Sequence, residues 1–333
     1  MRRHPSHLLK LILAGPLILL FAFPALAVPR LEQWLAPQLG KLQNDFSYQG
    51  YYYPKSDLEN QKADMGISGH AFKAQAPLWQ SPDDELALMA QAGYFNADTQ
   101  AILPDSGRQF PEDLWDLSAG LSYRHRSAGG WIWGGFVSLG SRSDKPFHSE
   151  NETDASLTGF LRLPHGEKNA WLLMLNWTNN RDFLSGSPIP GLAYYYNPSP
   201  KFKAILGAPL LALRYRPHKQ WALSFYYMYP RNVDARLTWQ PVKRLRLYTG
   251  FDWTNQRFYL ADRPHTENML FYFQKRGFLG AGYELGGGLY LNLETGYSFD
   301  RLFFEGENYQ DRHQERLDLE NAWFASLKLG IRF

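Results

Sequence analysis

Three side chains that could hydrolyse an ester lie close together in the sequence. Asp64, Ser68 and His70 supply an acid, a nucleophile and a base, the residue types of a hydrolytic relay. On one face of an extended segment, their spacings of four and two residues separate them by about 14 and 7 Å. A relay needs hydrogen-bond contact, and the sequence contains no Gly-x-Ser-x-Gly or His-Glu-x-x-His motif. We therefore expect no enzyme, with a lipid hydrolase as the weakest alternative.

Carboxylates gather in two polar segments and could hold a divalent cation. Their spacing is irregular, which is typical of solvated loops, so we expect no metal site. The sequence has no Cys, which excludes a thiolate site and a disulfide framework. We expect no cofactor. The carboxylates are Asp144, Glu150, Glu152 and Asp154, and then Glu305, Glu307 and Asp311.

A third group of residues is basic and alternates with apolar neighbours. Within a water-filled space, rings of Arg or Lys favour anions electrostatically. The same charges could instead fill and hydrate a polar interior through ion pairs, and both interpretations stay open. The nine residues are Arg124, Arg126, Arg162, Arg214, Arg216, Arg244, Arg246, Lys328 and Arg332.

The elements that carry these residues have the period of β-strands. Leu117, Ala119, Leu121 and Tyr123 alternate with polar residues, and comparable segments of eight to ten residues recur from residue 44 to the end. Such alternation puts apolar side chains on one face and polar side chains on the other. A soluble all-β protein would also alternate. A membrane barrel, however, needs only one apolar face per strand.

The last segment decides between these two classes. Its apolar face ends on an aromatic carboxy terminus and comprises Trp323, Leu327, Leu329, Ile331 and Phe333. The segment resembles the closing strand of bacterial outer-membrane β-barrel, porin-like proteins. The resemblance implies a transmembrane, antiparallel, up-and-down β-barrel in the bacterial outer membrane. It further implies that the barrel-assembly machinery recognises these residues, and that membrane lipids and lipopolysaccharide surround the barrel.

Connection lengths predict the number of strands. Turns in such barrels are short on the periplasmic side and long outside, and strand number is even. The segment 189–197 resembles a strand, but counting it gives an odd number, whereas assigning it to a Pro-rich outer loop gives fourteen. We predict about fourteen strands, with twelve or sixteen as alternatives.

The amino-terminal segment has the features of an export signal. Residues 1–27 combine basic residues, an apolar run and the small-residue site Ala25-Leu26-Ala27, as in a secretory signal peptide. A retained membrane anchor is the alternative. Residues 28–43 would form a short periplasmic segment, and residues 44–333 the barrel.

Composition fits this interpretation. Aromatic residues make up 16% of the chain, as expected where aromatic girdles mark two membrane interfaces. A net charge of +3 is too small to favour nucleic acid. The sequence therefore predicts passive passage of small hydrophilic solutes, among them anions if the basic residues line the passage. The alternative is a closed barrel with a structural or surface-interaction role.

Overall fold

The computed structural model describes residues 38–181, 184–229 and 232–333. These residues are almost entirely β-structure, with a single 3₁₀ turn, η1 (Glu150–Glu152). The strands are β1 (Asp45–Asp57), β2 (Asp64–Gln80), β3 (Asp84–Thr99), β4 (Asp113–Arg126), β5 (Ile132–Ser143), β6 (Thr153–His165), β7 (Asn169–Thr178), β8 (Ile189–Ser199), β9 (Phe202–Ala208), β10 (Leu210–His218), β11 (Trp221–Met228), β12 (Asn232–Val242), β13 (Leu245–Phe258), β14 (Met269–Gly286), β15 (Leu289–Gly306), β16 (Gln314–Leu319) and β17 (Ala322–Arg332).

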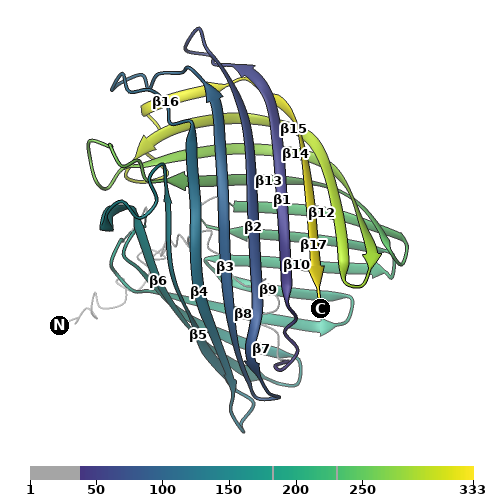
Figure 1. The fold of residues 1–333 in the computed structure, drawn as a ribbon. Coiled ribbons are helices and arrows are strands. Elements are labelled where there is room, and N and C mark those ends of the chain that lie inside the picture. The colour runs from purple at the N-terminus through teal and green to yellow at the C-terminus, as the bar shows by residue number, and fades with distance from the viewer. Residues whose placement is uncertain (1–37, 182–183, 230–231) are drawn as a thin grey trace, which may run out of the picture.

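The sheet closes on itself into a barrel of sixteen strands. Each strand from β1 to β15 pairs antiparallel with the next along the chain, and β17 pairs with both β15 and β1. The closing seam runs from Asp45 opposite Arg332 to Tyr52 opposite Ala325. Strand β16 pairs with β15 beyond the outer end of β17, outside this ring. Figure 1 shows the near-wall strands β1–β4 crossing the far-wall strands β10–β13, as tilted barrel strands do.

The prediction of fourteen strands is wrong, and the alternative of sixteen is correct. Residues 189–197, predicted as an outer loop, belong to β8, which pairs with β7 and β9. Residues 202–218 form two strands, β9 and β10, joined at Pro209. The alternation changes phase there, because Leu206 and Leu211 both face outward although five residues separate them. That phase change and the Pro are the signals of a turn.

Two walls of the barrel differ in height. Strands β7–β12 have between 7 and 11 residues, whereas β14 and β15 have 18 each. A membrane-crossing strand needs about 9–11 residues. The short wall therefore matches the membrane, and β13–β15 with β1–β3 extend beyond it. The extension lies at the end opposite the two termini, where Asn44 N donates to Phe333 O at 3.0 Å.

The predicted domain boundaries are only partly visible. The predicted signal peptide, residues 1–27, and residues 28–37 of the predicted periplasmic segment lie outside the described residues. Residues 38–43 are described, and they lead into β1. Barrel residues 44–333 form the sheet described above.

Candidate functional site

A packed apolar cluster fills the outer half of the lumen beside the tall wall. We call it the outer core. Its members are all less than 5% exposed and come from β1–β4, from β13–β17 and from the loops that follow β1, β3 and β13. Because an apolar cluster this dense excludes water, solutes cannot pass through this part of the barrel. It comprises Tyr53, Leu58, Met65, Ile67, Phe95, Ala97, Ala101, Leu103, Phe110, Leu114, Phe258, Leu260, Leu270, Tyr272, Phe278, Phe303, Leu317, Leu319 and Phe324.

Strands β13 and β14 reach across the lumen to build this core. Phe95 on β3 packs against Phe258 on β13, with ring centroids 5.8 Å apart, and against Tyr272 on β14 at 5.7 Å. Just beyond β13, Tyr259 N donates to Arg142 O at 2.7 Å and forms a bridge to Ser143 at the end of β5. The far wall therefore meets the near wall at the outer mouth.

Charged side chains lie beneath the outer core in matched pairs. Arg276 binds Asp252 through two hydrogen bonds of 2.8 and 2.6 Å and lies over the ring of Phe324. Arg142 donates to Asp154 at 3.0 Å. Buried charges need such partners, since desolvation alone would expel them. The sequence analysis did not single out Arg276. The available signal was its alternation with Lys275, which faces outward.

A polar cavity of about 240 Å³ lies between these pairs and the outer core. Lys73, Gln91 and Asp116 line it from β2–β4, while Thr254 and Arg276 line it from β13 and β14. Gln91 Nε2 donates to Asp116 at 2.5 Å. The cavity holds both signs of charge, so it is suited to water or to a small polar solute.

The nine predicted basic residues lie towards the periplasmic ends of their strands. Glu85 holds Arg124, and Asp45 accepts from Arg332 at 2.9 Å. Arg162 lies over the ring of Tyr195 at 5.8 Å. The structure thus brings these nine residues to one end of the barrel, and carboxylates pair with Arg124 and Arg332 there. Arg126, Arg162, Arg214, Arg216, Arg244, Arg246 and Lys328 are the other seven members, distributed over β4, β6, β10, β13, β17 and the turn before β13.

The inner wall of β10–β13 is more accessible than the outer core. Arg214, Ser224, Arg236 and Arg246 are all half-buried on the inner face. Arg236 pairs with Asp234 at 2.8 Å, and its side chain remains 36% exposed. Water therefore reaches the lumen along this wall.

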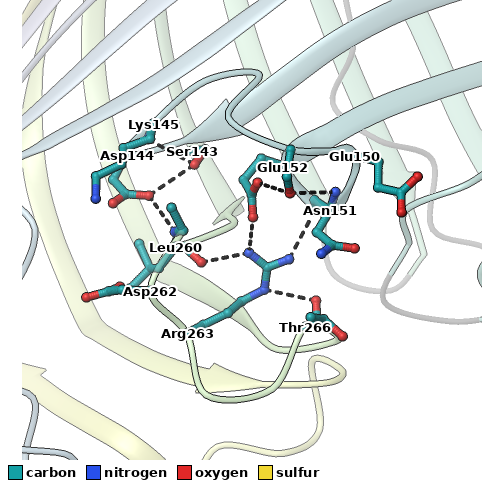
Figure 2. Close-up of polar contacts among 12 residues, drawn as sticks. Ser143, Asp144, Lys145, Glu150, Asn151, Glu152, Leu260, Asp262, Arg263 and Thr266 are labelled. Atoms are coloured by element: carbon teal, nitrogen blue, oxygen red, sulfur yellow. Dashed lines mark hydrogen bonds and ion pairs between the residues drawn. The ribbon is translucent and has the colours of Figure 1, made fainter.

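An ion pair and several hydrogen bonds connect the loops on the outer side of the barrel. Arg263, in the loop after β13, donates to Glu152 in η1 at 2.7 Å and to Leu260 O at 2.6 Å (Figure 2). Both side chains are at most 4% exposed. Although burial opposes its charge, hydrogen bonds from Ser149 and Arg263 hold the pKa of Glu152 below its usual value.

A second set of polar contacts holds loop 100–112 over the outer mouth of the barrel. Arg108 donates to Glu305 at 2.6 Å and to Asp262 at 3.2 Å. Glu315 accepts from the backbone of Asp105 and Ser106, each at 2.9 Å. Burial opposes the charge of Arg108, but its pKa is nonetheless raised, because Glu305 and Asp262 stabilise the cation.

The residues considered for a hydrolytic relay do not assemble into one. Ser68 and His70 lie on the outward face of β2, where Tyr48 OH hydrogen-bonds His70 Nδ1 at 2.7 Å. Asp64 instead pairs with Lys55 at 3.3 Å. The geometry therefore argues against acyl chemistry at these three residues.

Several of the carboxylates considered for a cation accept from protein donors. Asp144 accepts from Ala261 N at 2.8 Å, and Glu152 pairs with Arg263 at 2.7 Å (Figure 2). Asp154, which lies on β6, pairs with Arg142 at 3.0 Å. Within residues 38–181, 184–229 and 232–333, no three His, Asp or Glu side chains are arranged to hold a metal ion. In the same ranges, no helix is long and apolar enough to cross a membrane.

The outward face forms an apolar belt around the barrel. Leu139, Leu157, Leu175, Leu223 and Leu293 are each about half exposed, with values from 49 to 55%. The predicted assembly residues of β17 lie on this face, and Trp323 and Phe333 are 66 and 64% exposed. Leu327, Leu329 and Ile331 lie between them. Recognition of this face by assembly machinery stays a prediction.

No protein-family model and no curated protein matches the chain. Among solved structures, an outer membrane channel from Pseudomonas putida F1 has 12% identity and a TM-score of 0.36, covering 88% of this chain and 96% of its own. The P. putida toluene transporter TodX has 10% identity and a TM-score of 0.37, covering 88 and 90%. The translocator domain of the autotransporter NalP from Neisseria meningitidis has 10% identity and a TM-score of 0.34, covering 88 and 89%.

The strand pairing and the apolar outward belt are the evidence for the architecture. A closed barrel leaves every strand paired, which is what the lipid interior requires. An even number of antiparallel strands, short turns at the end with the termini and an apolar outward belt characterise bacterial outer-membrane barrels. The chain accordingly is a bacterial outer-membrane β-barrel.

Proposed function

We propose that this barrel is a narrow channel for small hydrophilic solutes and that it favours anions. The observation that carries the proposal is the half-buried inner wall of β10–β13, which leaves polar side chains in contact with water. Sixteen strands enclose enough space for an aqueous channel. The outer core occupies part of that space, so the passage would be narrower than the ring alone allows.

The proposed preference for anions rests on the basic residues of the periplasmic end. Arg214 and Arg246 face the lumen from this accessible wall. A water-filled constriction with an excess of cations attracts anions and repels cations.

Ion selectivity in a planar bilayer tests this proposal. We expect the purified protein to conduct, with a reversal potential in a salt gradient that indicates anion preference. The double variant Arg214→Gln/Arg246→Gln should lower the anion-to-cation permeability ratio several-fold, since each charge acts at about 1 kcal/mol in water. The matched control is Lys219→Gln/Lys243→Gln, which removes two exposed charges from periplasmic turns and should leave the ratio unchanged. Cation selectivity of the unmodified protein would refute the proposed preference.

A closed barrel with a structural role is the second candidate. The outer core and the loop ties of Arg108 and Arg263 favour it, because together they seal much of the outer mouth. A folded protein that inserts into the bilayer but carries no current would support this candidate over the channel.

A further inference from the structure

The polar cavity beneath the outer core is built by two facing parts of the barrel. Residues of β2–β4 form one side, and residues of β13 and β14 form the other. Small residues keep the space open, since Ala71 and Gly93 line it on β2 and β3. Beside them, the ring of Tyr51 lies directly against Gly69, where a Cβ would be 2.2 Å from the Cζ atom of Tyr51. The cavity volume of about 240 Å³ therefore depends on residues with little or no side chain.

Lys73 brings a cation to this cavity without an ion pair of its own. It lies opposite Gln91 in the β2–β3 ladder, and its side chain is exposed on the inward face. Asp116 also lines the cavity, but it lies opposite Arg142 in the β4–β5 ladder. In the part of the chain that the structure describes, no carboxylate forms an ion pair with the Lys73 ammonium. This cation is thus accessible to an anion in the cavity.

Gln91 presents a hydrogen-bond acceptor to the same space. Its side chain is 8% exposed, and because Nε2 donates to Asp116 at 2.5 Å, Oε1 is the atom left over. Among residues 38–181, 184–229 and 232–333, neither this oxygen nor the hydroxyl of Thr254 on the facing wall has a hydrogen-bond partner. Buried polar atoms are normally satisfied, since leaving them unpaired costs free energy. A ligand that donates hydrogen bonds between the two walls would satisfy them.

The balance of charge around the cavity favours an anion. Its lining cations outnumber the lining carboxylate Asp116 by four to one. Asp154 and Asp252 pair with two of these cations, and including them still leaves four cations against three carboxylates. A surplus positive charge beside a polar cavity attracts a ligand with one negative charge. The four lining cations are Lys73, Arg142, Arg257 and Arg276.

We propose that the polar cavity binds a small hydroxycarboxylate, with the carboxylate at Lys73 and a hydroxyl group that donates to Gln91 Oε1. An apolar carboxylate would leave Gln91 and Thr254 without partners, and a neutral polyol would leave Lys73 without a counter-charge. Only a ligand with both groups meets both requirements. The role of this ligand as a transported solute rests on the proposed channel, whereas its binding in the cavity does not.

Isothermal titration calorimetry of the full-length protein in detergent tests the site, with gluconate as the probe. Sorbitol and hexanoate are the matched compounds, because each has a carbon chain of the same length and lacks either the charge or the hydroxyl groups. We expect gluconate to bind at least about tenfold more tightly than either compound, since each of them loses one class of hydrogen bond in the cavity.

Two variants locate the binding in the cavity. Lys73→Met removes the cation, and Ala71→Leu fills the space while every polar group stays in place. Each should weaken gluconate binding at least about tenfold. Lys62→Met, which removes an exposed lysine from the loop after β1, should bind gluconate as the unmodified protein does. Heat-modifiable gel mobility checks that each variant is folded, and Lys73→Met should fold normally because it breaks no ion pair.

Three outcomes would overturn the site. These are no binding of gluconate, equal binding of gluconate and sorbitol, and unchanged gluconate binding by folded Lys73→Met. Current across a planar bilayer then separates the site from the channel. Gluconate binding by a protein that carries no current would uphold the site and refute the channel. Current through a protein that does not bind gluconate would uphold the channel and overturn the site.

Discussion

Individual cations in the interior are held by an aromatic ring together with oxygen acceptors. Arg276 combines Asp252 with Phe324, and Arg301 lies 5.0 Å from the ring centre of Tyr53 while donating to Ser56 and to Glu320 O. Both arrangements join residues that are far apart in sequence. Asp252 lies opposite Arg276 on the neighbouring strand, whereas Phe324 and Tyr53 each lie two strands away from the cation that they contact. Parity predicts which residues face inward, but the order and register of the strands decide which of them meet.

The Arg276–Asp252 pair should matter for stability. Asp252→Asn removes the carboxylate from a side chain that is 5% exposed and leaves the guanidinium buried without its counter-charge. Breaking such a pair costs about 3–5 kcal/mol. The measurement is the temperature at which the folded, fast-migrating gel band converts to the unfolded one. Asp300→Asn is the control, since the Lys275–Asp300 pair is exposed and worth at most about 1 kcal/mol.

A second comparison sharpens this test. The double variant Asp252→Leu/Arg276→Met removes both charges and should recover most of the lost stability, because no charge then remains unpaired. If the double variant were as unstable as the sum of the two single variants, the ion pair would not be the cause.

At the scale of elements, the sequence predicts strands well where alternation is long and continuous. Its errors fall on the short wall, where β9 has seven residues and the connection to β10 is the single residue Pro209. Apolar residues on both faces hide the turn there, since the inward Ile205 and Leu210 are as apolar as the outward Leu206 and Leu211. The alternation of apolar and polar residues that marks barrel strands is therefore lost at this wall.

Glycines set how closely strands can approach at the near wall. A Cβ at Gly134 on β5 would lie 2.0 Å from Tyr123 O on β4, whereas a Cβ at Gly159 on β6 would have no atom within 4 Å. Gly134→Ala should therefore force strands β4 and β5 apart and destabilise the barrel by about 1–3 kcal/mol. Gly159→Ala should be neutral. Yield of the heat-modifiable form after refolding measures both, and equal yields would show that the ladder adapts without cost.

The whole molecule is asymmetric from one side to the other and from one end to the other. The tall wall carries the outer core, and polar contacts hold its loops over the mouth. The short wall carries the accessible polar face and an inner apolar cluster of Leu172, Ala193, Ile205 and Leu210. Any passage through the barrel must therefore run beside β7–β12. This arrangement depends on long-range packing of loops 100–112 and 259–268, and no local pattern in the sequence reveals it.

Closure of the mouth should depend on pH through Glu152. Because the folded-state pKa of this carboxyl is lowered, its ionised tie to Arg263 contributes fully above the unfolded value of about 4.3. The contribution is lost as the pH falls through the lower folded pKa.

Glu152→Gln should reproduce this loss at pH 7. Truncating a buried charged pair costs about 2–5 kcal/mol, so proteinase K should cut loop 259–268 at least about tenfold faster in the variant. Glu150→Gln, an exposed neighbour in the same 3₁₀ turn, should be cut at the original rate. Unchanged cleavage of the Glu152 variant would mean that Arg108 and its partners hold the mouth closed without this tie.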